Sequence, residues 1–256
     1  MRKSKRSVGE VFESNRCGKF IITKVLGSSC EVKFFDTGWV SIFKNKHIVE
    51  GKVKDQKARL TFGVGYTDGQ KTMINKKYLP SYSYWLGILE RGYSEKLVLK
   101  YPSYERVSVC DEWHSYKNFN KWFEDNYREE FNGYGLDKDL ICRGLDKIYS
   151  PKTCVFLPQR LNTLLINKYK NRKGKTLPIG VTKKSGDSKY CARYHIGEKQ
   201  PYVIGYFDCA EEAWRSYKTY KEEYIKSLAE EYYSKGKIST KVYCLLMSYE
   251  VFKEYQ

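Results

Sequence analysis

Residues 180–217 read GVTKKSGDSKYCARYHIGEKQPYVIGYFDCAEEAWRSY, and this stretch decides the fold of the C-terminal part of the chain. It contains three short runs, GVTKK, KYCARYHI and YVIGYF, which are separated by polar turns. Short runs of this kind between turn residues predict strands. From Asp208 onward the apolar residues recur at helical spacing, and Asp208 is a suitable N-cap. We therefore expect a three-stranded sheet followed by a helix.

Alternation along residues 189–196 predicts that the middle strand has one cationic and one apolar face, because successive strand residues point to opposite sides. The residues expected on the cationic face are Lys189, Cys191, Arg193 and His195. Those expected on the packed face are Tyr190, Ala192, Tyr194 and Ile196. The expected packing stripe of the helix consists of Ala213, Tyr217, Tyr220, Tyr224 and Leu228. Ser239 is expected to cap a final short helix.

The charge of the chain points to a polyanionic partner. Its 256 residues include 47 Lys and Arg against 30 Asp and Glu, which gives a formal net charge of +17. Nucleic acid fits this excess because each neutralised phosphate releases a counterion. A membrane surface would fit the charge too, but no stretch approaches the roughly 18 apolar residues of a membrane-spanning helix. The basic leader Met1–Arg6 is not followed by an apolar signal core, so we expect a soluble, cytoplasmic protein without a membrane partner.

The eight cysteines are scattered along the chain, and none of them forms a C-x-x-C pair. Most structural zinc sites use such closely spaced thiolates. We therefore expect reduced, mostly buried cysteines, since burial is the usual fate of a free cysteine.

The rest of the chain divides by composition. Residues 1–65 combine the basic leader with β-rich runs at 19–26, 30–35 and 39–43, which predict a small bent sheet or partial barrel. Residues 66–167 have a mixed pattern. Helices are expected there around residues 84–91 and after Ser115, a suitable cap, with one face formed by Tyr116, Phe119, Phe123 and Tyr127.

Residues 168–178 form a basic linker that includes Lys170, Arg172 and Lys173. Two interpretations of the linker stay open. It is either a solvated connector or a set of phosphate contacts that becomes ordered on DNA. The final segment, residues 179–256, contains the three-stranded sheet and the C-terminal helices.

The motifs GVTKK from Gly180, KYCARY from Lys189 and YVIGYFDCAEEAWRSY from Tyr202 resemble the AP2 family of DNA-binding domains, found in plant regulators and phage endonucleases. In that family a three-stranded antiparallel sheet lies in the major groove and a helix braces it from behind. The resemblance implies a DNA side formed by Lys183, Lys184, Lys189, Arg193 and either Lys199 or Tyr202. Arginine on such a face reads guanine with two hydrogen bonds, whereas lysines hold phosphates. Thr182 stands where many members carry Arg, and a basic surface sheet that binds nothing is the alternative.

The middle segment resembles the diverged HNH (His-Me finger) proteins that phages often fuse to AP2 domains. The resemblance rests on VCDEWHSYKNFNKWFEDNY from Val109, GLDKD from Gly135 and YSPKTCVFLPQRLN from Tyr149. It implies a β-hairpin followed by a helix around one divalent ion, and metal-dependent phosphodiester cleavage. The expected oxygen ligands of Mg²⁺ are Asp137, Asp139 and Asn162.

Lys138 stands where this segment is expected to present the catalytic histidine. A nuclease of this kind needs a neutral imidazole to take a proton from water, and a lysine is protonated at neutral pH unless burial lowers its pKa. An active enzyme would therefore have to use Lys138 or His114 near the scissile phosphate. A histidine at the surface, at the start of a helix, is the commoner explanation for His114. Asp137 and Asp139 fit ion pairs with basic neighbours as readily as metal binding.

Together these features predict an α+β protein with a small N-terminal β-barrel-like module, a diverged HNH-type middle domain and a C-terminal AP2-like sheet plus helix. The expected function is double-stranded-DNA binding of the phage homing-endonuclease type, in the cytoplasm of the host cell. Cleavage with Mg²⁺ is one outcome. A catalytically inactive regulator or an inhibitor of a host system is the other, and the missing histidine favours it. RNA binding and a protein partner stay open as further alternatives.

Overall fold

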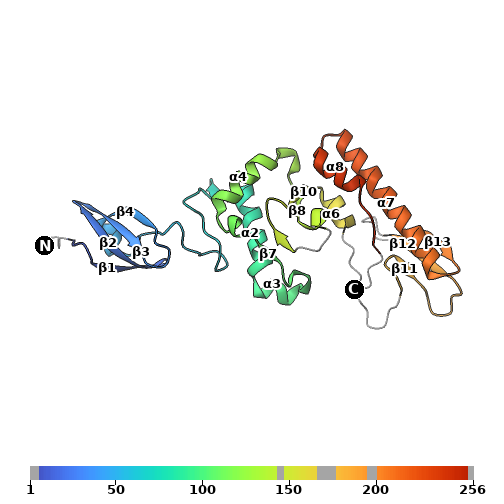
Figure 1. The fold of residues 1–256 in the computed structure, drawn as a ribbon, viewed down its shortest axis with the longest axis horizontal. Helices are drawn as coiled ribbons and strands as arrows, with labels where there is room; N and C mark the ends of the chain where they lie inside the picture. Colours follow the sequence, from blue (N-terminus) through green and yellow to red (C-terminus); the bar gives the residue numbers. More distant parts are fainter. Residues whose placement is uncertain (1–5, 143–146, 166–176, 195–200, 253–256) are drawn as a thin grey trace. The chain divides into compact units, whose positions relative to one another are not determined.

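The computed structural model describes residues 6–142, 147–165, 177–194 and 201–252. It separates the chain into two compact units, and Figure 1 shows their helices and strands. Unit 1 comprises residues 1–125 and 147–151, and unit 2 comprises residues 126–146 and 152–256. Both units mix helices and strands, which confirms the expected α+β class. The boundaries expected at residues 65, 167 and 178 stay predictions.

The N-terminal strands form an antiparallel sheet in the order β1 (Val11–Ser14), β2 (Gly18–Leu26), β3 (Ser29–Phe34) and β4 (Val40–Lys44). One face of the sheet is buried through Phe20, Ile22, Cys30, Val32 and Phe34. Among the strands that the structure describes, β1 and β4 are free edges, so the expected barrel-like module is instead an open sheet. The physical reason is the segment that directly follows β4 in the sequence. Helix α1 (Asn45–Val49) buries Ile48 in the core at the point where a barrel would need a further strand.

The rest of unit 1 is built around aromatic side chains. Its helices and strands include β5 (Met73–Ile74), β6 (Lys77–Tyr78), α2 (Pro80–Tyr93), α3 (Glu95–Lys100), β7 (Ser108–Val109), α4 (Tyr116–Asn126) and β9 (Ile148–Tyr149). The indole of Trp85 is fully buried and donates a 2.7 Å hydrogen bond to the carbonyl oxygen of Trp113. Both helices expected from the sequence are present. Tyr116, Phe119 and Phe123 are buried as predicted, whereas Tyr127 follows the end of α4.

The described residues of unit 2 form two small sheets and the helices that pack on them. Its elements include β8 (Gly135–Asp137), α5 (Asp139–Cys142), β10 (Val155–Leu157), α6 (Gln159–Leu165), β11 (Val181–Thr182), β12 (Tyr190–Tyr194), β13 (Tyr202–Phe207), α7 (Ala210–Ser234) and α8 (Thr240–Met247). Strands β8 and β10 are antiparallel, and β11, β12 and β13 form the expected three-stranded antiparallel sheet in that order. Helix α7 packs along this sheet (Figure 1), and one continuous apolar core joins it to β10 and α6.

The starts of the two C-terminal helices differ in how well the sequence predicted them. Ser239 caps α8 as expected, because its hydroxyl accepts a 3.3 Å hydrogen bond from the Val242 amide. The N-cap of α7 is Cys209, whose sulfur accepts a hydrogen bond from the Glu212 amide, and not Asp208. The Asp208 carboxylate instead lies 3.4 Å from the Lys189 ammonium. Asp208 therefore pairs with Lys189, just before β12, and does not cap α7.

The packing stripe of α7 includes a lysine that the sequence analysis missed. Ala213, Tyr217 and Leu228 are buried as predicted, and Lys221 is buried with them, with 1 % of its surface exposed. Its ammonium nitrogen lies 5.7 Å from the ring centre of Tyr194 and 5.8 Å from that of Tyr217. Burial lowers the pKa of Lys221 to about 8, because an apolar environment disfavours the charged form.

This buried lysine predicts an unusual dependence of stability on pH. An unfolded chain binds the Lys221 proton up to about pH 10.4, whereas the folded protein releases it near pH 8, so the contribution of Lys221 to the free energy of unfolding should rise between these values. Burial also raises the pKa of tyrosines such as Tyr194 and Tyr217, which lowers stability near pH 10, so the lysine effect is measured against Lys221→Met. The difference in unfolding free energy between wild type and this variant should shift in favour of wild type by about 2 kcal/mol from pH 8 to pH 10, as measured by urea unfolding. A difference that does not change with pH contradicts the prediction.

Candidate nucleic-acid interface

The register of the three-stranded sheet in unit 2 gives it two distinct faces. On one face, Val181 pairs with Ala192 and Tyr190 pairs with Phe207, and all four side chains contribute to the core shared with α7. The other face carries the row Thr182, Cys191 and Tyr206, and beside it the pair Arg193 and Val203. We call these five residues the open face. The alternation predicted for β12 is thereby confirmed for residues 190–194.

Two polar atoms of the open face lack partners. The Oγ1 atom of Thr182 and the Nε atom of Arg193 are both buried, and neither forms a hydrogen bond within the part of the chain that the structure describes. Leaving a buried polar atom unsatisfied typically costs about 1–3 kcal/mol. Such atoms in a native protein call for a specific explanation, and a ligand or a water molecule that completes the hydrogen bonds is one.

Lysines surround the open face. Lys183 and Lys184 are exposed in the turn after β11, and Lys189 is exposed just before β12. The ammonium nitrogen of Lys183 lies 4.3 Å from the ring centre of Tyr190, and that of Lys189 is paired with Asp208. Exposed pairs of this kind contribute roughly 0–1 kcal/mol, so a phosphate can replace the carboxylate easily.

Tyr202 contacts helix α7, whereas Tyr206, for which the sequence suggested no role, lies on the open face. Tyr202 was expected on the DNA side, but its ring stacks on Tyr220 of α7, with centres 5.1 Å apart and planes inclined by 10°. Tyr206 lies on the open face and is 63 % exposed. The cause is a β-bulge: Ala192 pairs with Gly205 whereas Arg193 pairs with Val203, so one extra residue of β13 shifts the alternation. Lys199, Lys170, Arg172, Lys173 and His195 lie outside the described residues.

The segment expected to hold Mg²⁺ lies around β8, β10 and α6. Asp137 ends β8 and is buried, and its Oδ2 atom accepts hydrogen bonds from the amides of Asp139 (3.0 Å) and Leu140 (2.7 Å). These two bonds satisfy the free amides at the start of α5. Burial raises the pKa of Asp137 to about 6. The carboxylate therefore has a structural role at the beginning of a helix.

Asp139, the second expected ligand, is also engaged. The ammonium of Lys138 donates a 2.5 Å hydrogen bond to the carboxylate of Asp139. Asn162 lies against the opposite end of β8, since a Cβ atom on Gly135 would come within 2.6 Å of its Nδ2 atom. Gly135 and Asp137 are two strand residues apart, a rise of roughly 6–7 Å. Within the described ranges no group of three His, Cys, Asp or Glu side chains is placed to hold a metal ion. A Mg²⁺ site formed by Asp137, Asp139 and Asn162 stays a prediction.

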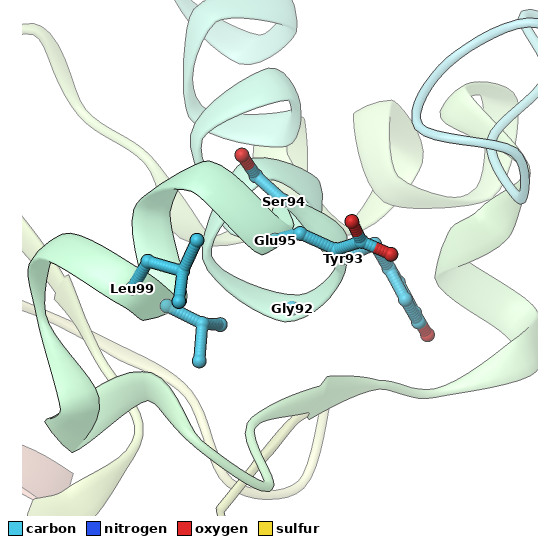
Figure 2. Close-up of a pocket in the computed structure, with 6 residues that line it drawn as sticks. Gly92, Tyr93, Ser94, Glu95 and Leu99 are labelled. Carbon is cyan, nitrogen blue, oxygen red and sulfur yellow. The ribbon is translucent and has the colours of Figure 1, made fainter.

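His114 belongs to unit 1, whereas Lys138 belongs to unit 2. Its Nε2 atom lies 2.8 Å from the Tyr93 hydroxyl and its Nδ1 atom 3.7 Å from the Asp111 carboxylate. Beside Tyr93 is a mostly apolar hollow of about 430 Å³, whose lining Figure 2 shows. It is formed by Gly92, Tyr93, Ser94, Glu95, Val98 and Leu99. His114 does not line it, so its ring supports the end of α2 through Tyr93.

Comparisons of the chain with protein-family models, curated proteins and solved structures find no match. Every helix within the described ranges is too short or too polar to span a lipid bilayer. Functional inference therefore depends on the residues of the chain itself.

The environment of Asp137 predicts a second pH effect. Its pKa is raised to about 6 in the folded protein, so the folded state binds more protons than the unfolded state between about pH 4 and 6. Stability should therefore fall as the pH rises through this window. Asp137→Asn keeps an acceptor oxygen for the α5 amides and should abolish the fall, whereas Asp137→Ala should be about 1 kcal/mol less stable than Asp137→Asn. Equal stability of these two variants in urea would refute the capping role.

Proposed function

We propose that this protein binds double-stranded DNA through the open face of its C-terminal sheet. The observation that carries the proposal is the position of Arg193 on that face, away from the core shared with α7, with Lys183, Lys184 and Lys189 exposed in the adjoining turns. A formal charge of +17 supports a polyanionic ligand. DNA would supply acceptors for the guanidinium and counter-charges for the lysines.

The arrangement favours a duplex major groove. The groove is about 12 Å wide in B-DNA and admits strands, and an arginine there can donate two hydrogen bonds to guanine O6 and N7. Duplex RNA has a major groove too narrow for side chains to read. Arg193 is therefore assigned to base recognition, and the surrounding lysines are assigned to phosphates. The exposed ring of Tyr206 adds an apolar contact surface on the same face.

The contacts of the middle segment favour a protein that binds DNA and does not cleave it. Asp137 is engaged as a helix cap, and the Asp139 carboxylate is paired with Lys138. The proposed role is accordingly that of a DNA-binding regulator, or an inhibitor of a host system, of the type that phages carry.

The test of the binding face compares Arg193→Gln with wild type, by fluorescence anisotropy on labelled duplexes selected from a random pool. Loss of a bidentate contact should weaken binding of the selected duplex by about tenfold or more, and relax its sequence preference. Lys241→Gln, an exposed substitution on α8, is the control for the loss of one charge and should change the affinity little. Because Arg193 Nε forms no hydrogen bond with any residue that the structure describes, the unfolding free energy of Arg193→Gln should stay close to that of wild type. Unchanged affinity would exclude this face.

The proposal also predicts no nicking of supercoiled DNA with Mg²⁺ or Mn²⁺, followed on agarose gels. Cleavage that disappears in an Asp137→Ala, Asp139→Ala double variant would establish a nuclease instead. Competition by equal lengths of duplex DNA and duplex RNA separates the two nucleic acids, and stronger competition by RNA would overturn the choice of DNA.

A further inference from the structure

A short hairpin in unit 1 presents lysines and apolar side chains together. It is formed by β5 and β6, in which Met73 pairs with Tyr78 and Ile74 pairs with Lys77. The surrounding sequence, residues 69–89, contains Lys71, Lys76 and Lys77 but no Asp or Glu. The positive charge of these three lysines is therefore not balanced by carboxylates within the stretch. The hairpin carries a local excess of positive charge.

The hairpin is exposed at its tip and fixed at its base. Met73, Ile74 and Tyr78 are 39 %, 47 % and 55 % exposed. At the base, the Leu79 amide donates a 3.0 Å hydrogen bond to the Thr72 carbonyl oxygen. The Tyr78 ring lies 5.1 Å from that of Tyr82, which in turn packs on the buried Trp85 at 5.6 Å. The apolar side chains near the tip are thus held out by a rigid support and are not part of the core.

The turn of the hairpin contains a residue that is unfavourable for its conformation. Asn75 and Lys76 both have positive φ, 50° and 61°, as the two central residues of a tight hairpin turn. Asparagine tolerates this region, but glycine is the residue usually found at the second position. Lysine at position 76 is strained there, and it places a positive charge at the outermost point of the ribbon. A function that uses this charge would account for its presence.

We propose that this hairpin is a second DNA-binding element, which enters a groove of the duplex and binds phosphates through Lys76 and Lys77. The inference rests on the proposed DNA-binding function and extends it to unit 1. A two-stranded ribbon fits the major groove, and its apolar side chains can contact thymine methyl groups there. Ile74 shares a face with Lys77 and is the side chain assigned to this contact.

A lipid surface is the competing occupant, because lysines next to apolar residues also suit anionic headgroups. The apolar surface near the tip is limited to a few side chains, whereas interfacial anchoring typically uses a whole apolar helix face. The three lysines of this stretch, with no carboxylate among them, instead suit a partner whose negative charges are closely and regularly spaced. These features favour the DNA backbone.

The test uses Lys76→Gly in the full-length protein. Glycine relieves the positive φ, so the melting temperature should stay the same or rise, while DNA binding should weaken. Loss of one phosphate contact should lower the affinity by about fivefold to tenfold at 0.1 M salt and reduce the slope of log K against log salt by about one. Lys121→Gln removes one exposed charge from α4 and serves as the control, with little expected change. Ile74→Ser should weaken binding without changing the salt slope.

The outcomes separate this inference from the proposed function. If Arg193→Gln weakens binding and Lys76→Gly does not differ from Lys121→Gln, the hairpin is not a DNA contact while the sheet proposal stands. If the wild-type protein binds no duplex, both proposals fail. If wild type binds phosphatidylserine vesicles and Lys76→Gly does not, with DNA binding equal in both, the hairpin contacts lipid and the inference is overturned.

Discussion

The close approach of helix α7 to one face of a three-stranded sheet governs the C-terminal half of the molecule. Small residues make this approach possible. Ala192 and Ala213 are completely buried, and a Cβ atom on Gly180 would come within 2.2 Å of the Tyr217 ring. Because a single helix covers a single face, the apolar residues of the strands must be gathered on that side. The opposite face is then left for other purposes, and it is there that Arg193 and Thr182 hold unsatisfied polar atoms.

The same contact explains where sequence reasoning succeeds in this unit and where it fails. Strand alternation depends on local geometry, so the two faces of β12 and the pattern of α7 could be predicted from residue spacing alone. The bulge beside Arg193 depends on how two strands pair, and it places Tyr202 on the packed face, opposite Tyr206. Lys221 was missed because a lysine in a helical stripe is ordinarily solvated. Here it lies among Tyr194 and Tyr217, which hydropathy does not reveal.

The middle segment shows a different limit. The resemblance to HNH proteins implies that Asp137, Asp139 and Asn162 act together on one ion, and this stays a prediction. The structure places Asp137 at the end of β8, Asp139 at the start of α5 and Asn162 in α6. A carboxylate at the start of a helix is stabilised by free amides, and that local demand engages Asp137. The adjacent Lys138 neutralises Asp139. A short motif can therefore specify backbone geometry and leave the chemistry undetermined, since hydrogen bonds within the protein compete with a metal for the same oxygen atoms.

The excess of positive over negative side chains concerns the whole chain. The 47 cationic side chains outnumber the 30 carboxylates by 17, and this excess positive charge must be balanced by counterions or a polyanion. Pairs such as Arg215–Glu211 and Lys235–Glu231 use carboxylates one helical turn away, which leaves few for the turns of the sheet or the hairpin. Under the proposed function, each of the two cationic elements adds phosphate contacts, and the sum of these contacts sets how steeply binding depends on salt.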